Sequence, residues 1–210
     1  MTRIKICGLF RHVDVSYVNM TLPDYVGFVF AKSPRQVSEQ RATSMRKVLD
    51  ERITPVGVFV DAPIEMMARL YNQGVIQVAQ LHGKEVAKRC RLLRQESDVP
   101  IIAAVTLARP DSSQLADSPS ELCYPPEADY LLLDNVRPGS GQRFDWELIK
   151  QANLDRPYFL AGGIKRFNID AALRLKPFAI DVSSGAEKDG HKDLRKIEYL
   201  VRKVREGEKP

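Results

Sequence analysis

Cysteine and long apolar runs are both scarce in this chain. Its 210 residues include three cysteines, none in a Cys-x-x-Cys spacing, which argues against a disulfide framework and against a zinc site. No apolar run approaches the roughly 18 residues that a membrane span needs. The N-terminal residues Met1–Ile4 lead straight into a strand-like segment, without a recognisable secretion signal. We therefore expect a cytoplasmic protein with reduced thiols, no bound metal and no membrane partner.

The basic residues lack the aromatic companions of a nucleic-acid surface. The formal net charge is +5, and the densest basic run, within residues 192–205, is interrupted by acidic residues and contains no alternating series of aromatics. We interpret this run as the solvated face of a helix and expect no nucleic-acid partner. A modest positive field instead suits a small anionic substrate.

Eight short apolar segments alternate with amphipathic stretches along the chain. Start signals such as Ser38 and Asn168 precede several of these stretches and predict helices. Apolar residues on both faces of the short segments predict parallel strands joined by crossover helices. The predicted strands are Ile4–Cys7, Tyr25–Phe30, Pro55–Val60, Val75–Leu81, Pro100–Leu107, Tyr130–Asp134, Tyr158–Ala161 and Phe178–Val182.

This alternation predicts a single-domain α/β protein, a (β/α)8 TIM barrel that spans residues 1–210. Dividing 210 residues among eight units gives about 26 residues per unit, near the short end of that fold's range. A doubly wound open sheet is the rival fold, but Cys7-Gly8-Leu9-Phe10 is no glycine-rich nucleotide fingerprint. The prolines and serines of residues 108–128 predict a long loop or a reduced, irregular fifth helix.

Polar and glycine residues follow the predicted strands at their carboxyl ends. In a barrel these ends meet at one mouth, where helix N-termini concentrate positive potential. Gly162-Gly163 and Ser183-Ser184-Gly185 follow the seventh and eighth strands, where such barrels usually hold phosphate. We therefore predict a phosphate cradle there, with Cys7 and Asp134 at the same mouth. A positive mouth should also help the Cys7 thiol to ionise.

The motifs together resemble phosphoribosylanthranilate isomerase of tryptophan biosynthesis. They are Lys5-Ile6-Cys7-Gly8, Gly27-Phe28-Val29-Phe30 with Ser33-Pro34-Arg35, Val56-Gly57-Val58-Phe59-Val60, Gln80-Leu81-His82-Gly83, Leu132-Leu133-Asp134, Gly139-Ser140-Gly141, Leu160-Ala161-Gly162-Gly163-Ile164 and Asp181-Val182-Ser183-Ser184-Gly185. The resemblance runs from residue 3 to about residue 193. It implies an Amadori rearrangement of a phosphorylated aminoaldose without any cofactor.

Roles for individual residues also come from the resemblance. It implies Asp134 as general acid and Cys7 as general base, while Arg35 suits the anthranilate carboxylate through a bidentate fork. His82 and Asp181 are candidates for contact with the sugar, and Lys5 for a partner of Asp181 one layer below Cys7.

Plainer interpretations stay open for each residue, and for the chain as a whole. Cys7 could be a small buried hydrophobe, Asp134 a loop cap, Arg35 a surface residue and His82 a loop histidine. Another sugar-phosphate isomerase or epimerase, or a non-catalytic binding barrel, remains the alternative function. The sequence does not fix the oligomeric state, for which a monomer is the working assumption.

Overall fold

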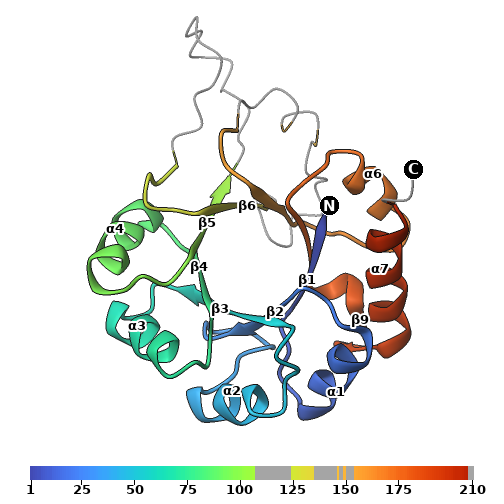
Figure 1. Cartoon of the computed structure of the whole chain (residues 1–210), viewed down its shortest axis with the longest axis horizontal. Helices are drawn as coiled ribbons and strands as arrows, with labels where there is room; N and C mark the ends of the chain where they lie inside the picture. The colour runs from blue at the N-terminus through green and yellow to red at the C-terminus, as the bar shows by residue number, and fades with distance from the viewer. Residues whose placement is uncertain (107–123, 135–145, 147–148, 150–153, 208–210) are drawn as a thin grey trace, which may run out of the picture.

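The computed structural model describes residues 1–106, 124–134, 146, 149 and 154–207. In it eight parallel strands form a closed barrel in which neighbours follow chain order and β8 pairs with β1 (Figure 1). The predicted (β/α)8 barrel is thereby confirmed. The strands are β1 (Arg3–Cys7), β2 (Tyr25–Val29), β3 (Thr54–Val60), β4 (Val78–His82), β5 (Ile101–Thr106), β6 (Tyr130–Asp134), β7 (Tyr158–Leu160) and β8 (Ala179–Val182).

The helices lie around the outside of this barrel (Figure 1). They are α1 (His12–Thr21), α2 (Glu39–Arg46), α3 (Ile64–Asn72), α4 (Val86–Glu96), α6 (Ile169–Leu173) and α7 (Leu194–Glu206). Within the described chain, none of them is long and apolar enough to cross a membrane. Most of the predicted irregular segment 108–128 lies outside the described residues, and residues 124–128 form a turn without helix or strand.

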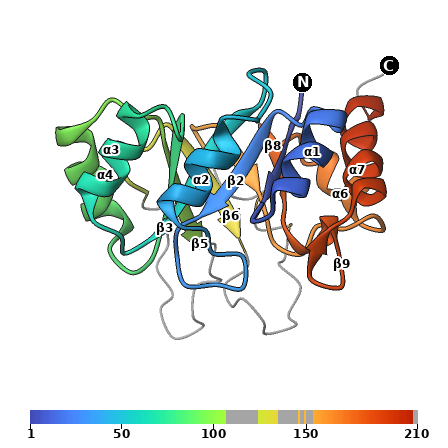
Figure 2. The same ribbon diagram turned by 90° about the horizontal axis from the view of Figure 1, so that it is seen from below.

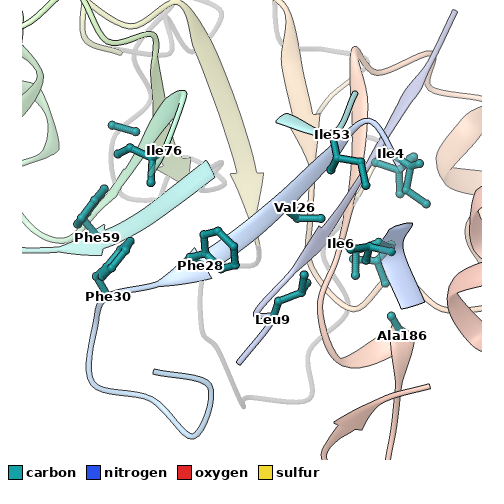
Figure 3. Packing of buried hydrophobic residues seen from close by; sticks show 14 of the residues in the cluster. Ile4, Ile6, Leu9, Val26, Phe28, Phe30, Ile53, Phe59, Ile76 and Ala186 are labelled. Carbon is teal, nitrogen blue, oxygen red and sulfur yellow. The ribbon is translucent and has the colours of Figure 1, made fainter. Parts of the chain in front are cut away.

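The two faces of each strand serve different cores. Outward side chains such as Ile4, Ile6 and Phe28 are fully buried in the layer between strands and helices (Figure 3). In the same layer Phe30 stacks on Phe59 with ring centroids 5.1 Å apart. Each such side chain contributes about 1.5–3 kcal/mol through burial. A separate cluster, which includes Val56 and other inward residues, fills the barrel and supports the polar layer above it.

Most predicted strand boundaries differ from the structure by a residue, and two boundaries differ by more: the sequence predicted a helix as far as Asp50 and the start of the fourth strand at Val75. Helix α2 ends at Arg46 because the following amides turn back to carbonyls three residues earlier, as in Leu49 N–H to Arg46 O at 3.2 Å. Strand β4 begins at Val78 because the amide of Val75 instead donates to Leu70 O at 3.0 Å, at the end of α3. Both stretches satisfy helix ends before the next strand begins.

A short hairpin extends the connection between β8 and α7. After a 3₁₀ turn at Ser184–Ala186, strands β9 (Glu187–Lys188) and β10 (His191–Lys192) pair antiparallel. The residues joining them, Asp189 and Gly190, have φ of 50° and 77°, the combination that a tight hairpin turn of the primed type requires. Figure 2 shows this hairpin at the lower end of the barrel, opposite the end where the N-terminus lies.

Candidate active site

Three of the predicted site residues are the last residues of their strands. Cys7 ends β1, His82 ends β4 and Asp134 ends β6. The carboxyl ends of parallel strands in a closed barrel share one rim, so these side chains reach the same mouth. Cys7 is 8% exposed and Asp134 is half-buried. The structure thus brings the thiol and the carboxyl to one end of the barrel.

An ion pair lies inside the barrel just below this rim. Lys5 is fully buried, and its Nζ donates to Asp181 Oδ2 at 3.0 Å. The alternation of strand β1 placed Lys5 inward with Cys7, as predicted. Burial opposes the charge of Lys5, but Asp181 and Cys7 outweigh it, so the pKa of Lys5 is raised. Lys5 therefore stays an ammonium group beside the thiol.

Burial decides the protonation of Cys7. It raises the pKa of the thiol, and the opposing effects of Lys5 and Lys192 are too small to reverse it. The lysine effects have the direction expected of a positive mouth, but burial, which the sequence does not show, outweighs them. Cys7 is a thiol in the resting protein, and its activation requires loss of a proton.

Gly27 of β2 makes room for the thiol. A Cβ atom at this position would lie 2.7 Å from Cys7 Sγ, inside van der Waals contact. The register places Gly27 directly beside Cys7 across the β1–β2 pair. A side chain there would displace the sulfur, so the Gly27 position fixes where Sγ can lie.

Arg35 lies over Gly8, the first residue of the loop after β1. A Cβ at Gly8, whose φ is 83°, would be 2.5 Å from Arg35 Cδ, so the arginine stem covers this glycine. Its Nε and Nη2 donate to Glu187 Oε1 and Oε2 at 2.6 and 2.7 Å. The bidentate pair predicted for a substrate carboxylate is therefore formed with Glu187 through Nε and Nη2. A further anion would have to bind the guanidinium edge that carries Nη1.

Glu187 and Lys192 join this cluster from the β9–β10 hairpin. Lys192 is 3% exposed, and its Nζ lies 2.6 Å from Glu187 Oε1 and 3.1 Å from Ser183 O. Burial lowers the pKa of Lys192, whereas bonds from Arg35 and Lys192 outweigh burial and lower the pKa of Glu187. No role was predicted for Glu187, and the interpretation of residues 192–205 as a solvated helix face was wrong for Lys192, which lies in β10 and is buried. The signal was the Asp189-Gly190 turn, which predicts a hairpin.

His82 pairs with a neighbour on its own strand. Gln80 Nε2 lies 2.6 Å from His82 Nε2, and Gln80 is 2% exposed. Burial and the charge of Lys5 lower the pKa of His82 to about 4, although Asp181 acts in the opposite direction. The imidazole is therefore neutral at physiological pH. Gln80 was quoted in the sequence motif, but no role was assigned to it.

The half-buried ring of His82 makes stability depend on pH. Its folded pKa, about 4, lies below the ordinary value of 6.5, so the unfolded chain binds the proton more readily. The associated stability is fully present above pH 6.5 and is lost as the pH falls toward 4, by up to roughly 3 kcal/mol. Denaturant titrations should show the wild type losing more unfolding free energy over this interval than a His82→Gln variant.

A matched control separates the effect of the His82 ring from the number of histidines in the chain. His12→Gln removes one exposed histidine from α1 and leaves His82 in place, so it should keep the wild-type slope. Parallel curves for the wild type and His82→Gln would contradict the prediction.

The glycine and serine loops after β7 and β8 lie against each other. A Cβ at Gly185 would stand 2.0 Å from the carbonyl oxygen of Ile164, so only glycine permits this approach. Gly162 and Gly163 have φ of 87° and 69°, and a Cβ at Gly163 would meet no described atom. Ser184 is exposed beside them. The five residues predicted for phosphate, which also include Ser183, thus belong to one pair of adjoining loops.

The other cysteines have no part in this arrangement. Cys90 is fully buried on α4, and burial raises its pKa to about 12. Cys123 lies outside the described residues. Within the described ranges, no group of three or more His, Cys, Asp or Glu side chains could hold a metal ion.

Comparison with known proteins identifies one family. Residues 4–203 match the family described as N-(5'phosphoribosyl)anthranilate (PRA) isomerase. The N-(5'-phosphoribosyl)anthranilate isomerase of Lactiplantibacillus plantarum is 40% identical, over 97% of this chain and 92% of its own. That of Endomicrobium trichonymphae is 39% identical, over 98% of this chain and 99% of its own.

Solved structures agree. Phosphoribosyl anthranilate isomerase from Thermus thermophilus superposes with a TM-score of 0.79 at 33% identity, covering 98% of this chain and 99% of its own. Another phosphoribosyl anthranilate isomerase, in complex with reduced 1-(o-carboxyphenylamino)-1-deoxyribulose 5-phosphate, gives 0.77 at 30% identity, with 98% and 100% covered. The chain therefore belongs to the N-(5'-phosphoribosyl)anthranilate isomerase family.

Proposed function

We propose that this protein converts N-(5-phosphoribosyl)anthranilate to 1-(2-carboxyphenylamino)-1-deoxyribulose 5-phosphate in tryptophan biosynthesis. The observation that carries the proposal is the placement of Cys7 and Asp134 at one barrel rim, beside the adjoining glycine and serine loops of β7 and β8. The reaction moves hydrogen within one molecule, so it needs no external oxidant or reductant. Acid and base side chains are the chemistry that it requires.

Asp134 acts first, as general acid. Its proton goes to the furanose ring oxygen, the C1′–O bond breaks, and the anthranilate nitrogen forms a Schiff base with C1′. The side chain must be protonated at this moment, and the negative charges of the substrate's phosphate and carboxylate favour that form. Asp134 ends an inward-facing row of β6 and is half-buried, so its carboxyl faces the barrel mouth with limited solvent access.

Cys7 acts second, as general base. Its thiolate takes the proton from C2′, and the electron pair of that bond moves to give an enolamine. The enolamine takes up a proton at C1′ and its 2′-hydroxyl releases one as the ketone forms. The ammonium groups of Lys5 and Lys192 favour the thiolate against burial. In the resting thiol they lower the cost of ionisation, and during the reaction they stabilise the negative charge.

The two anionic ends of the substrate set its orientation. The loops at Gly162-Gly163 and Ser183-Gly185 offer backbone N–H groups and hydroxyls to the phosphate. Arg35 offers the guanidinium edge not bonded to Glu187 to the anthranilate carboxylate. Lys5 and Asp181 pair inside the barrel just below the rim, and we assign the sugar to their level. Holding both ends aligns C2′ with Cys7.

The function is tested by coupled synthesis of the unstable substrate. Anthranilate, phosphoribosyl pyrophosphate and the preceding transferase generate a fluorescent aminoaldose, and addition of the purified protein should remove the fluorescence. The Cys7→Ala variant is the matched control. A folded protein that leaves the fluorescence unchanged, or that turns over only the aminoaldose of histidine biosynthesis, overturns the proposal.

Arg35→Ala should mainly raise KM. A hydrogen bond to a charged group contributes about 1.5–3 kcal/mol, so a rise of roughly 10- to 100-fold is expected, with kcat little changed. The interaction with the carboxylate is present in both the ground and transition states, which is why KM carries the effect. Steady-state kinetics with varied substrate measure it.

Two further arginine variants test the assignment. Arg35→Lys keeps the charge but loses the planar fork, so its KM should lie between those of the wild type and Arg35→Ala. Arg52→Ala removes an exposed arginine paired with Asp50 and should leave KM unchanged. A large loss of kcat at constant KM in Arg35→Ala would contradict the role in binding.

A further inference from the structure

The side chains of Gln80 and His82 contact each other within the polar layer of the barrel. Both belong to β4 with the same strand parity, and the amide nitrogen of Gln80 lies 2.6 Å from His82 Nε2. The pair faces Lys5 of β1 and Asp181 of β8, whose charges act on the ring in opposite directions. It therefore sits at the level assigned above to the sugar.

The hydrogen bond determines which ring nitrogen carries the proton. A neutral imidazole has one N–H and one acceptor nitrogen, and an amide nitrogen has only hydrogens to donate. Nε2 must then be the acceptor, so the proton lies on Nδ1. In the opposite amide orientation Oε1 would accept from an Nε2–H, and the two amide N–H groups would be the buried groups without this partner in place of Oε1.

Two buried acceptor oxygens belong to the same polar layer as the Nδ1–H donor of His82. Gln80 Oε1 and Asp181 Oδ1 have no hydrogen-bond partner within the part of the chain that the structure describes. Their residues are 2% and 8% exposed, so solvation does not compensate fully. Two acceptors and one N–H donor match sugar hydroxyls, each of which donates one hydrogen bond and accepts others.

We infer that Gln80 is a positioning residue that holds His82 in its neutral Nδ1–H form, so that the ring offers one fixed donor to an oxygen of the substrate sugar. The part about the sugar rests on the proposed function. The part about the ring does not, because it concerns the protein alone. His82 is the group that touches substrate, and Gln80 acts through it.

Nitrogen NMR of the imidazole rings tests this inference without substrate. The chain has three histidines, so a long-range ¹H–¹⁵N spectrum of the labelled protein at pH 7 is simple, and His82→Gln identifies the resonances of His82. We expect a protonated Nδ1 and an unprotonated Nε2. A protonated Nε2 in the wild type overturns the inference, and this measurement needs no variant of Gln80.

Substitutions at Gln80 provide the second readout. Gln80→Met keeps the length of the side chain and removes the donor, so the Nδ1–H preference should be lost and kcat/KM should fall roughly 10- to 100-fold. Gln80→Glu presents an acceptor and should move the proton to Nε2. Gln77→Met, at an exposed site just before β4, should change neither the spectrum nor the kinetics. An unchanged tautomer in Gln80→Met also overturns the inference.

The two proposals fail separately in these experiments. A wild-type protein with Nδ1–H but no turnover of the anthranilate compound refutes the proposed function and supports the assignment of the ring. Turnover with a protonated Nε2 does the reverse. A shift of tautomer in Gln80→Met with unchanged kcat/KM refutes the contact between His82 and the sugar.

Discussion

Cys7→Ala should lower kcat by about 10²- to 10⁴-fold, the contribution typical of a positioned general base. The methyl group of alanine cannot accept the C2′ proton, and the described neighbours Lys5 and Lys192 carry positive charge, so they do not replace the base. The free energy of unfolding should fall by only about 1 kcal/mol, because removal of the sulfur leaves a small cavity beside Gly27. Fluorescence-based kinetics and thermal unfolding measure the two effects.

Two controls isolate the thiol chemistry. Cys7→Ser keeps the shape but offers a hydroxyl that ionises far less readily, so it should be nearly as inactive as the alanine variant. Cys90→Ala removes the fully buried cysteine of α4 and should cost stability while leaving kcat unchanged. Wild-type turnover by Cys7→Ser would remove Cys7 from the mechanism.

The same residue sets an expected pH profile. Because burial raises the pKa of Cys7, the base is mostly a thiol at neutral pH, and raising the pH increases the thiolate fraction. The thiolate fraction of Cys7, followed as the rate at which iodoacetamide alkylates this residue, should therefore keep rising through the alkaline range, beyond the ordinary thiol pKa of about 8.5. Lys192→Met removes one favourable charge and should move this rise to higher pH. An alkylation rate that levels off at or below the ordinary value would contradict the assignment.

Strand parity explains how much of this site was predictable. Because side chains alternate along a strand, Lys5 and Cys7 had to face the same way, and Asp181 had to face the interior two residues before Ser183. The Lys5–Asp181 ion pair follows from that alternation once β1 and β8 are neighbours in the barrel. The strand segments themselves were identifiable from their apolar runs, with errors only at the ends.

The contacts of the loops were not predictable in the same way. Arg35 and Glu187 are 152 positions apart, and their bond depends on how two irregular connections fold over the rim. No periodic pattern encodes such a meeting. The net pKa shift of Cys7 escaped for a related reason, since charges are visible in a sequence whereas the degree of burial that opposes them is not. Local rules thus predict the scaffold, and tertiary packing decides the electrostatics.

Asp134→Asn should abolish ring opening and reduce kcat by about 10²- to 10⁴-fold, because an amide has no acidic proton for the furanose oxygen. Asp129→Asn is the matched control just before β6. Asp129 accepts hydrogen bonds from Arg94 and from the Ile101 amide, so its substitution should affect stability only.

Substrate deuterated at C2′ separates the acid from the base. If Asp134 acts before Cys7, the Asp134→Asn variant is limited by ring opening and should show almost no isotope effect, because the C2′ bond breaks after the slow step. Cys7→Ser is instead limited by that bond and should express the isotope effect in full. The opposite pattern would exchange the two roles, and equal effects in both variants would mean that neither residue controls a separate step. The isotope effect therefore tests the order of proton transfers independently of the size of either rate loss, which structural damage could also produce.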